Sequence, residues 1–156
     1  MFTPQVIIYT DGSSRGNPGP GGYGVILMAG QLRKELSEGY RLTTNNRMEL
    51  MAVIKGLEAL KKPQTRVLVY SDSKYVVDAV EKGWLQGWLR TNFKGGKKNP
   101  DLWRRFHDIY VRHQVRFQWV KGHADNPYNN RCDELATEAA DHAPHLVDEW
   151  FEQNRD

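Results

Sequence analysis

Residues 66–73 read RVLVYSDS, and this stretch decides how the chain folds. Its first six residues form a short run rich in branched and aromatic side chains, which predicts a buried β-strand. Asp72 follows the strand, and Ser73 is a residue type that caps the N-termini of helices. The stretch therefore predicts a strand that leads directly into a helix, as in sheets whose parallel strands are joined by crossover helices.

Further strands and helices are predicted on both sides of this stretch. The predicted strands are 5–10, 23–29, 32–41, 66–71 and 115–120, and the predicted helices are about 46–60, 74–90 with breaks at Gly83 and Gly87, 100–113 and 129–142. The glycines and prolines of residues 16–24 predict irregular structure until about Tyr23. This order indicates an α/β fold. We expect a five-stranded mixed sheet, an antiparallel meander of strands 1–3 extended by parallel strands 4 and 5, with helices on both faces.

Length and composition are typical of one soluble globular domain. Hydrophobic residues make up 39% of the 156 positions and charged residues 26%, as in ordinary globular proteins. We expect a domain over residues 1–143 and an acidic tail over 144–156, which either packs as a short helix or frays. The apolar runs are too short to span a bilayer. The first residues show no basic region followed by an apolar region, so we expect no secretion by a signal peptide. A single cysteine, Cys132, fits a reducing compartment. We therefore expect a cytoplasmic monomer without membrane association.

Four acidic residues lie where predicted elements begin or end. They are Asp11 and Asp72, which follow buried strands, and Glu49 and Asp133, which lie near helix starts. Ligands in such sheets collect at the carboxyl ends of the strands. Carboxylates that converge there repel one another, and a hard divalent cation such as Mg²⁺ or Mn²⁺ relieves the repulsion. The pattern predicts metal-assisted chemistry on phosphate.

Each of these residues also has a purely structural explanation. Asp11 and Asp72 are of a type that commonly ends strands in a turn. Glu49 could complete a capping box with Asn46, and Asp133 could complement a helix dipole. Four independent coincidences of this kind are improbable together, which favours the metal site.

His123 and a basic segment are two further candidates. His123 lies in a predicted loop between a strand and a helix. Histidine side chains can transfer protons near pH 7. Without the neighbouring acidic residues, His123 would be interpreted as an ordinary surface histidine. Residues 84–105 carry six cations against Asp101 alone, whereas the whole chain has a net charge of +3. Aromatic residues interleave with these cations, which favours nucleic acid over a merely solvated face. Trp84 and Trp88 are four apart, so we expect one of them to pack inward.

Four blocks of sequence together resemble bacterial type 1 ribonuclease H (ribonuclease HI). They are TDGSSRGNPGPGGYG at 10–24, TTNNRMELMA at 43–52, YSDSKYV at 70–76 and VKGHADNPYNNRCDELA at 120–136. The resemblance covers about residues 5–142 and implies the ribonuclease H fold and hydrolysis of the RNA strand of RNA–DNA hybrids. It also implies a Mg²⁺-binding tetrad of Asp11, Glu49, Asp72 and Asp133, with Mn²⁺ as a possible substitute. Two ions are expected with substrate bound, and His123 is expected to assist departure of the leaving group or product.

The resemblance also implies a nucleic-acid-binding surface. Its expected members are Asn17, Asn45 and Ser73 along the minor groove, Thr44 at a DNA phosphate, Lys74 where glutamine is common, and Trp84, Trp88, Arg90, Lys94, Lys97 and Lys98 in a basic protrusion that grips the DNA strand. Leu42 stands where the family often has a basic residue. Arg41 is one position earlier and would face the other way unless the strand bulges.

Two other functions remain open from the sequence alone. One is a hybrid-binding module that has lost catalysis, and the other is a nuclease of the same fold that cleaves DNA. Selectivity for RNA would have to depend on the 2′-hydroxyl, for which Asn17, Asn45 and the backbone of residues 12–14 are candidates. Contacts to phosphate ignore base identity, so we expect cleavage to be largely independent of sequence.

Overall fold

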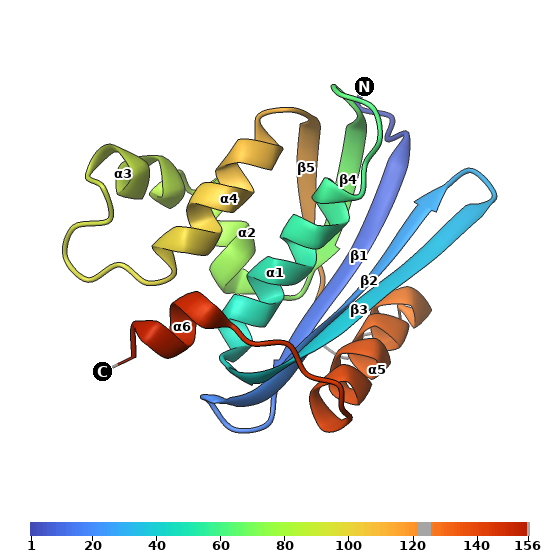
Figure 1. The fold of residues 1–156 in the computed structure, drawn as a ribbon. Helices are drawn as coiled ribbons and strands as arrows, with labels where there is room; N and C mark the ends of the chain where they lie inside the picture. Colours follow the sequence, from blue (N-terminus) through green and yellow to red (C-terminus); the bar gives the residue numbers. More distant parts are fainter. Residues whose placement is uncertain (122–125, 156) are drawn as a thin grey trace.

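The fold is built on a five-stranded mixed sheet with the strand order β3-β2-β1-β4-β5 (Figure 1). The computed structural model describes residues 1–121 and 126–155. The strands are β1 (Val6–Ser14), β2 (Gly19–Ala29), β3 (Leu32–Thr43), β4 (Arg66–Ser71) and β5 (Gln114–Trp119). Strands β1, β2 and β3 pair antiparallel, whereas β4 pairs parallel with both β1 and β5. The predicted fold class and strand directions are confirmed.

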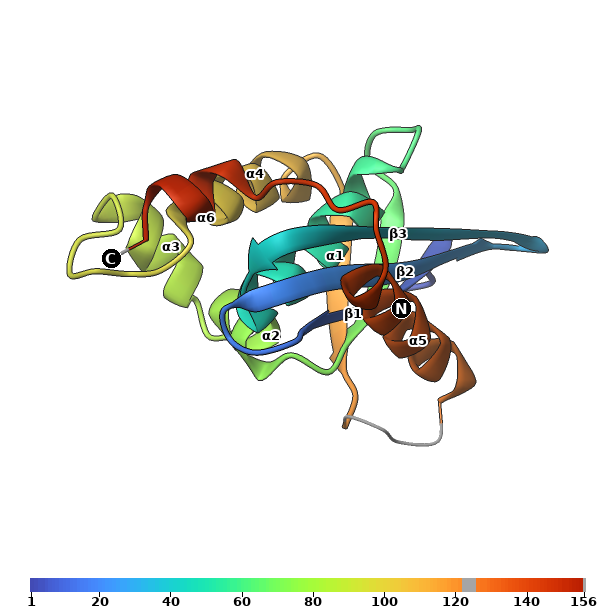
Figure 2. The same ribbon diagram turned by 60° about the horizontal axis from the view of Figure 1, so that its bottom comes forward.

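Helices cover both faces of this sheet. They are α1 (Asn45–Glu58), α2 (Lys74–Glu81), α3 (Trp84–Arg90), α4 (Pro100–Tyr110), α5 (Pro127–Asp141) and α6 (Glu149–Gln153). The larger core joins Ile8 and Val25 of the sheet to α1 and α4, where Trp103 and Phe106 are fully buried. Helix α5 lies on the opposite face (Figure 2), where Tyr9 and Ile26 pack with its Cys132. Successive side chains of a strand point to opposite faces of the sheet, so alternate residues pack into two different layers.

The glycine-rich segment is more regular than its sequence predicts. Strand β1 continues to Ser14 and β2 begins at Gly19, because the two strands stay paired as far as Ser14 opposite Gly21. The glycines serve close packing here: a Cβ at Gly22 would lie 2.6 Å from the carbonyl oxygen of Ala136 in α5. Residues 15–18 are irregular as predicted, but the prediction was wrong for residues 19–23, because tertiary packing requires small residues within a strand there.

The helix predicted over 74–90 is two helices. The break lies at Gly83, whose φ of 77° is open to glycine without strain, whereas Gly87 lies inside α3. Helix α4 ends at Tyr110, three residues before the predicted limit. No helix among the described residues is long and apolar enough to cross a membrane.

The C-terminal segment packs against the body of the protein. The amide of Leu146 donates a hydrogen bond to the carbonyl oxygen of Gly39, and the amide of Arg41 donates to the carbonyl oxygen of Leu146. A short helix, α6, follows and lies near the start of α1 and the loop between α3 and α4 (Figure 1). Of the two outcomes left open by the sequence, the structure shows the packed helix.

Candidate active site

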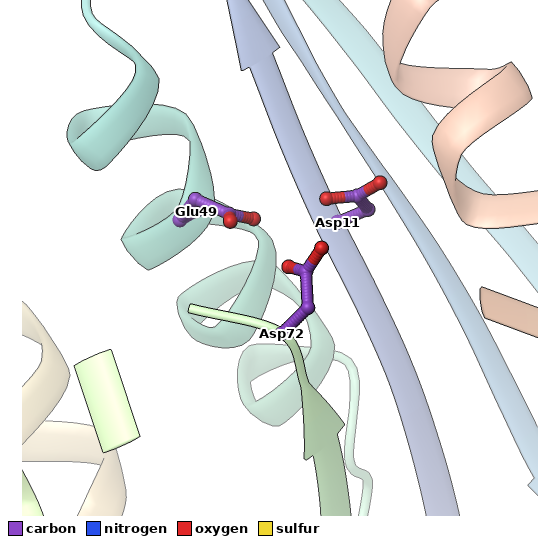
Figure 3. A group of neighbouring side chains, drawn as sticks. All are labelled: Asp11, Glu49 and Asp72. Atoms are coloured by element: carbon purple, nitrogen blue, oxygen red, sulfur yellow. The ribbon is translucent and has the colours of Figure 1, made fainter. Parts of the chain in front are cut away.

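Three carboxylates from three different elements meet at one point. Asp11 comes from β1, Glu49 from α1, and Asp72 from the residue after β4. One oxygen of each can be chosen so that all three lie within 4.8 Å of one another. Figure 3 shows the three side chains pointing toward one another. Asp11 lies inside its strand and not at its end, but the predicted convergence of these residues is confirmed.

Gly12 explains how Glu49 reaches the sheet. A Cβ at Gly12 would lie 2.3 Å from the backbone nitrogen of Glu49, so only glycine allows α1 to approach β1 this closely. The Gly12 amide then donates a 2.6 Å hydrogen bond to Oε1 of Glu49. This bond fixes the carboxylate beside Asp11, which is the preceding residue.

Gly24 allows a helix to approach the opposite face of the sheet closely. It pairs with Asp11 across β1 and β2, and a Cβ there would lie 2.3 Å from the carbonyl oxygen of Cys132. Helix α5 therefore comes close to the strand beside Asp11. Asp133 follows Cys132 and lines a narrow cavity together with Asp11 and Asp72. The fourth predicted carboxylate is thus beside the cluster, although it is outside the tight group of three.

The helix-capping explanations of the acidic residues are wrong. Helix α1 is capped by Thr44, whose hydroxyl accepts a hydrogen bond from the amide of Arg47, so Asn46 and Glu49 form no capping box. Helix α5 begins at Pro127 and is capped by Asn126. Asp133 therefore lies beyond the first turn, where the effect of the helix dipole has faded.

Burial and mutual repulsion both favour the protonated forms of two of these carboxylates. Burial, followed by the charges of Asp72 and Asp133, raises the pKa of Asp11 to about 8. Burial and then the charge of Asp11 raise the pKa of Glu49 well above its usual range. An uncompensated cluster is therefore costly at neutral pH, and a divalent cation would remove that cost.

The donor set fits such a cation. All three ligand atoms of the cluster are carboxylate oxygens, which suit Mg²⁺ or Mn²⁺ and not a thiolate-binding metal. Oδ1 of Asp72 is buried and has no hydrogen-bond partner among the described residues. Oδ1 of Asn129, in the same cavity, is also buried and unpaired within residues 1–121 and 126–155. Buried polar atoms are normally satisfied, so these oxygens are available to a ligand; sequence reasoning missed Asn129.

Two of the predicted minor-groove residues, Asn17 and Asn45, lie side by side at the surface. The backbone amide of Asn45 donates a 3.1 Å hydrogen bond to Oδ1 of Asn17, and both residues are exposed. Ser73 is buried, and its hydroxyl caps α2 by accepting from the amide of Val76. Lys74 is exposed, with its Nζ 4.2 Å from the ring centroid of Trp119. The loop that contains His123 lies outside the described residues.

The basic segment presents its charges to solvent. Arg90, Lys94, Lys97 and Lys98 are all exposed, and none of them pairs with a carboxylate among the described residues. Trp84 is 45% exposed, whereas Trp88 packs against Phe93 and Trp103. The prediction that one of the two tryptophans packs inward is confirmed.

Arg47 is a residue that sequence reasoning missed. Its side chain is only 1% exposed. It donates hydrogen bonds to both oxygens of Asp148, at 2.7 and 2.9 Å, and to Asp101 and Asn99. An arginine within the buried face of a predicted helix was the available signal. The C-terminal segment and the start of α4 are thereby tied to the first turn of α1.

Known proteins resemble this chain over nearly its whole length. A family model described as RNase H matches residues 3–141. The ribonuclease H of Syntrophus aciditrophicus (strain SB) is 58% identical over 151 residues, covering 94% of this chain and 87% of that protein. The structure of LC9-RNase H1, a type 1 RNase H with the type 2 active-site motif, is 32% identical with a TM-score of 0.81, covering 97% of this chain and 80% of that one. LC11-RNase H1, solved in complex with an RNA/DNA hybrid, is 28% identical with a TM-score of 0.64, covering 87% and 96%.

Proposed function

This chain belongs to the ribonuclease H family, and we propose that Asp11, Glu49, Asp72 and Asp133 hold the divalent ions with which it cuts RNA. The protein is a metal-dependent endonuclease that hydrolyses the RNA strand of RNA–DNA hybrids. The observation that supports the site is the group of three carboxylates within 4.8 Å, with one oxygen of Asp72 left unpaired. We assign Mg²⁺ as the ion, with Mn²⁺ as a substitute, and two ions when substrate is bound.

The acidic residues of the site position the reacting groups and compensate charge. They do not attack the substrate themselves. When bound, a pair of divalent ions activates a water molecule and stabilises the charge on the departing 3′ oxygen. Asp11 is held by a paired strand and Glu49 by the Gly12 amide, so the cluster is preorganised for that charge. We assign His123 the protonation of the leaving group, a role suited to its pKa class.

Recognition of the hybrid depends on the surface beside this cluster. Asn17 and Asn45 are joined by a hydrogen bond and exposed, and we assign them the reading of the minor groove and the RNA 2′-hydroxyl. Lys94, Lys97 and Lys98 would contact phosphates, as would Arg90, so cleavage would be largely independent of sequence. We further propose that the protein acts as a cytoplasmic monomer.

A cleavage assay with matched duplexes tests this function. Labelled RNA–DNA hybrid, DNA duplex and RNA duplex are incubated with the protein in Mg²⁺, and parallel reactions contain EDTA. We expect cleavage of the RNA strand of the hybrid alone, and only with the metal. Hybrid binding without cleavage would instead support an inactive binding module, and equal cleavage of duplex DNA would support a DNA nuclease.

The metal-free protein should become less stable as the pH rises. Because the pKa of Asp11 is about 8 in the folded state and near 4 in an unfolded chain, the folded state holds more protons between these values. The free energy of unfolding therefore falls as the pH rises through that window. Asp11→Asn keeps the Oδ1 acceptor but removes the charge. In EDTA at pH 8, its free energy of unfolding should therefore exceed that of wild type by about 1–3 kcal/mol.

Thermal unfolding in EDTA at pH 5 and pH 8 measures this effect. Asp108 is exposed on α4, so Asp108→Asn makes the same charge change away from the cluster. The stability advantage of Asp11→Asn should grow from pH 5 to pH 8, while Asp108→Asn shows none. An equal pH profile for wild type and Asp11→Asn would contradict the repulsion that we infer.

The basic segment should set the salt dependence of hybrid binding. Replacing Lys94, Lys97 and Lys98 by alanine should raise KM about tenfold or more at low salt, because contacts to phosphate release counterions. The slope of log KM against log salt should fall by two to three units, about one for each lost contact. The matched control replaces Lys34 of β3 and Lys61 and Lys62 after α1, which are exposed and line a pocket that includes no residue of the carboxylate cluster. Equal slopes in both variants would remove the basic segment from the interface.

A further inference from the structure

A groove of about 640 Å³ lies between α6, the start of α1 and the loop before α4. Thr44 and Asn46, at the start of α1, line one wall. Lys97 and Lys98, from the loop before α4, line the second. The third wall is the C-terminal segment, which contributes Trp150, Phe151, Asn154 and Arg155. Figure 2 also shows α6 beside the loop between α3 and α4.

The charge of this groove selects an anion. Lys97, Lys98 and Arg155 line it, and no carboxylate is among its described lining residues. Arg155 is exposed, and its guanidinium lies 5.7 Å from the ring centroid of Phe151. This cation thus rests on an aromatic ring of the groove wall, and it forms no salt bridge within residues 1–121 and 126–155.

The C-terminal wall is anchored by two carboxylates that are not among the lining residues of the groove. Asp148 is bound by Arg47 and also accepts a 2.7 Å hydrogen bond from the hydroxyl of Thr43. Glu152 binds Arg41 of β3 through two hydrogen bonds of 2.8 and 2.9 Å. Arg41 is therefore occupied by α6, and the cation that the C-terminal segment presents to the groove is Arg155.

Arg47 joins all three walls. Besides Asp148, it donates hydrogen bonds to Asn99 and Asp101 at the end of the basic segment, and it belongs to the first turn of α1. Its guanidinium lies 5.1 Å from the ring centroid of Trp150 and 5.9 Å from that of Phe151. The groove is therefore a built feature whose walls are fixed relative to one another.

The position of the groove identifies its occupant. Thr44 caps the helix that carries Glu49 five residues later, which is about 7.5 Å along the helix axis. The carboxylate cluster takes the phosphate that is cut, so other backbone phosphates of the same hybrid lie within reach of the groove. We propose that the C-terminal segment is part of the substrate-binding surface and that Arg155 contacts a backbone phosphate of the bound hybrid. This inference rests on the proposed function.

Charge reversal at Arg155 tests the contact. Arg155→Glu should raise the KM for hybrid about three- to tenfold at low salt and leave kcat within twofold. The salt slope should fall by about one unit or more. Arg112→Glu is the matched control, because Arg112 is exposed after α4 at the edge where β5 begins, and the change in net charge is the same. Circular dichroism confirms that both variants are folded.

Neutral methylphosphonate linkages then identify the strand. They are placed one at a time in each strand near the cleavage site, and at one position wild type and Arg155→Gln should become equal in KM. If Arg155→Glu and Arg112→Glu shift KM and the salt slope alike, the contact does not exist. If no linkage in either strand removes the difference, Arg155 does not contact a backbone phosphate. A wild-type protein that leaves hybrid uncut would overturn the proposed function itself, whatever the variants do.

Discussion

Glu49→Gln is expected to lose about a hundredfold to a thousandfold in the rate of hybrid cleavage while it keeps its fold and its affinity for hybrid. Glu49 is 7% exposed and lies within the cluster formed with Asp11 and Asp72. The amide retains an oxygen that accepts the hydrogen bond from Gly12, so packing of α1 on β1 should survive. It lacks the charge that would compensate a divalent ion, and loss of one preorganised electrostatic contact typically costs 10² to 10³ in rate.

Single-turnover cleavage and fluorescence anisotropy separate the two effects. Cleavage with saturating protein reports the chemical step, and anisotropy with labelled hybrid reports the dissociation constant. Glu138→Gln provides the control, since Glu138 is exposed on α5 and loses the same charge. A Glu49→Gln variant that cleaves within tenfold of wild type would remove Glu49 from the set of metal ligands. Raising the Mg²⁺ concentration should restore part of the lost rate if affinity for the ion is what falls.

The sheet was predictable because its signals are local. The apolar runs around Ile8 and Val69 are short, branched and bounded by turn residues, so their strand assignment needs no knowledge of neighbours. The segment 16–24 was not predictable in this way. Its glycines follow the rule for turns locally, but Gly22 and Gly24 are needed because α5 packs against the strand. Only the contact with α5 decides between a turn and a strand in this segment.

The residues of the candidate site also fall into two groups: those predictable from the local sequence and those that depend on tertiary contacts. Asp11 and Asp72 follow predicted strands, so their convergence with each other follows from the sheet topology. The approach of Glu49 depends on Gly12, whose role is visible only once α1 is packed on β1. Arg47 and Asp148 are separated by 101 residues, and no local pattern connects them. Long-range pairs of this kind require coordinates.

Arg47→Met is expected to lower the free energy of unfolding by about 3–5 kcal/mol, which is the usual cost of removing one partner from a buried ion pair. Arg47 is 1% exposed and Asp148 is 6% exposed, so neither charge is solvated by water in the folded state. Methionine fills part of the space but leaves Asp148 with the hydroxyl of Thr43 as its remaining side-chain donor among the described residues. The midpoint of thermal unfolding should fall by about 10 °C or more.

Arg105→Met is the matched control, because Arg105 also forms a two-bonded pair, with Glu58, but at the surface. The two side chains of that pair are 41% and 32% exposed, and surface pairs contribute only about 0–1 kcal/mol. The double variant Arg47→Met/Asp148→Leu should recover most of the loss, since apolar replacement of both partners is often neutral. If the double variant is as unstable as Arg47→Met, the cost comes from lost packing around Trp150 and not from the stranded carboxylate.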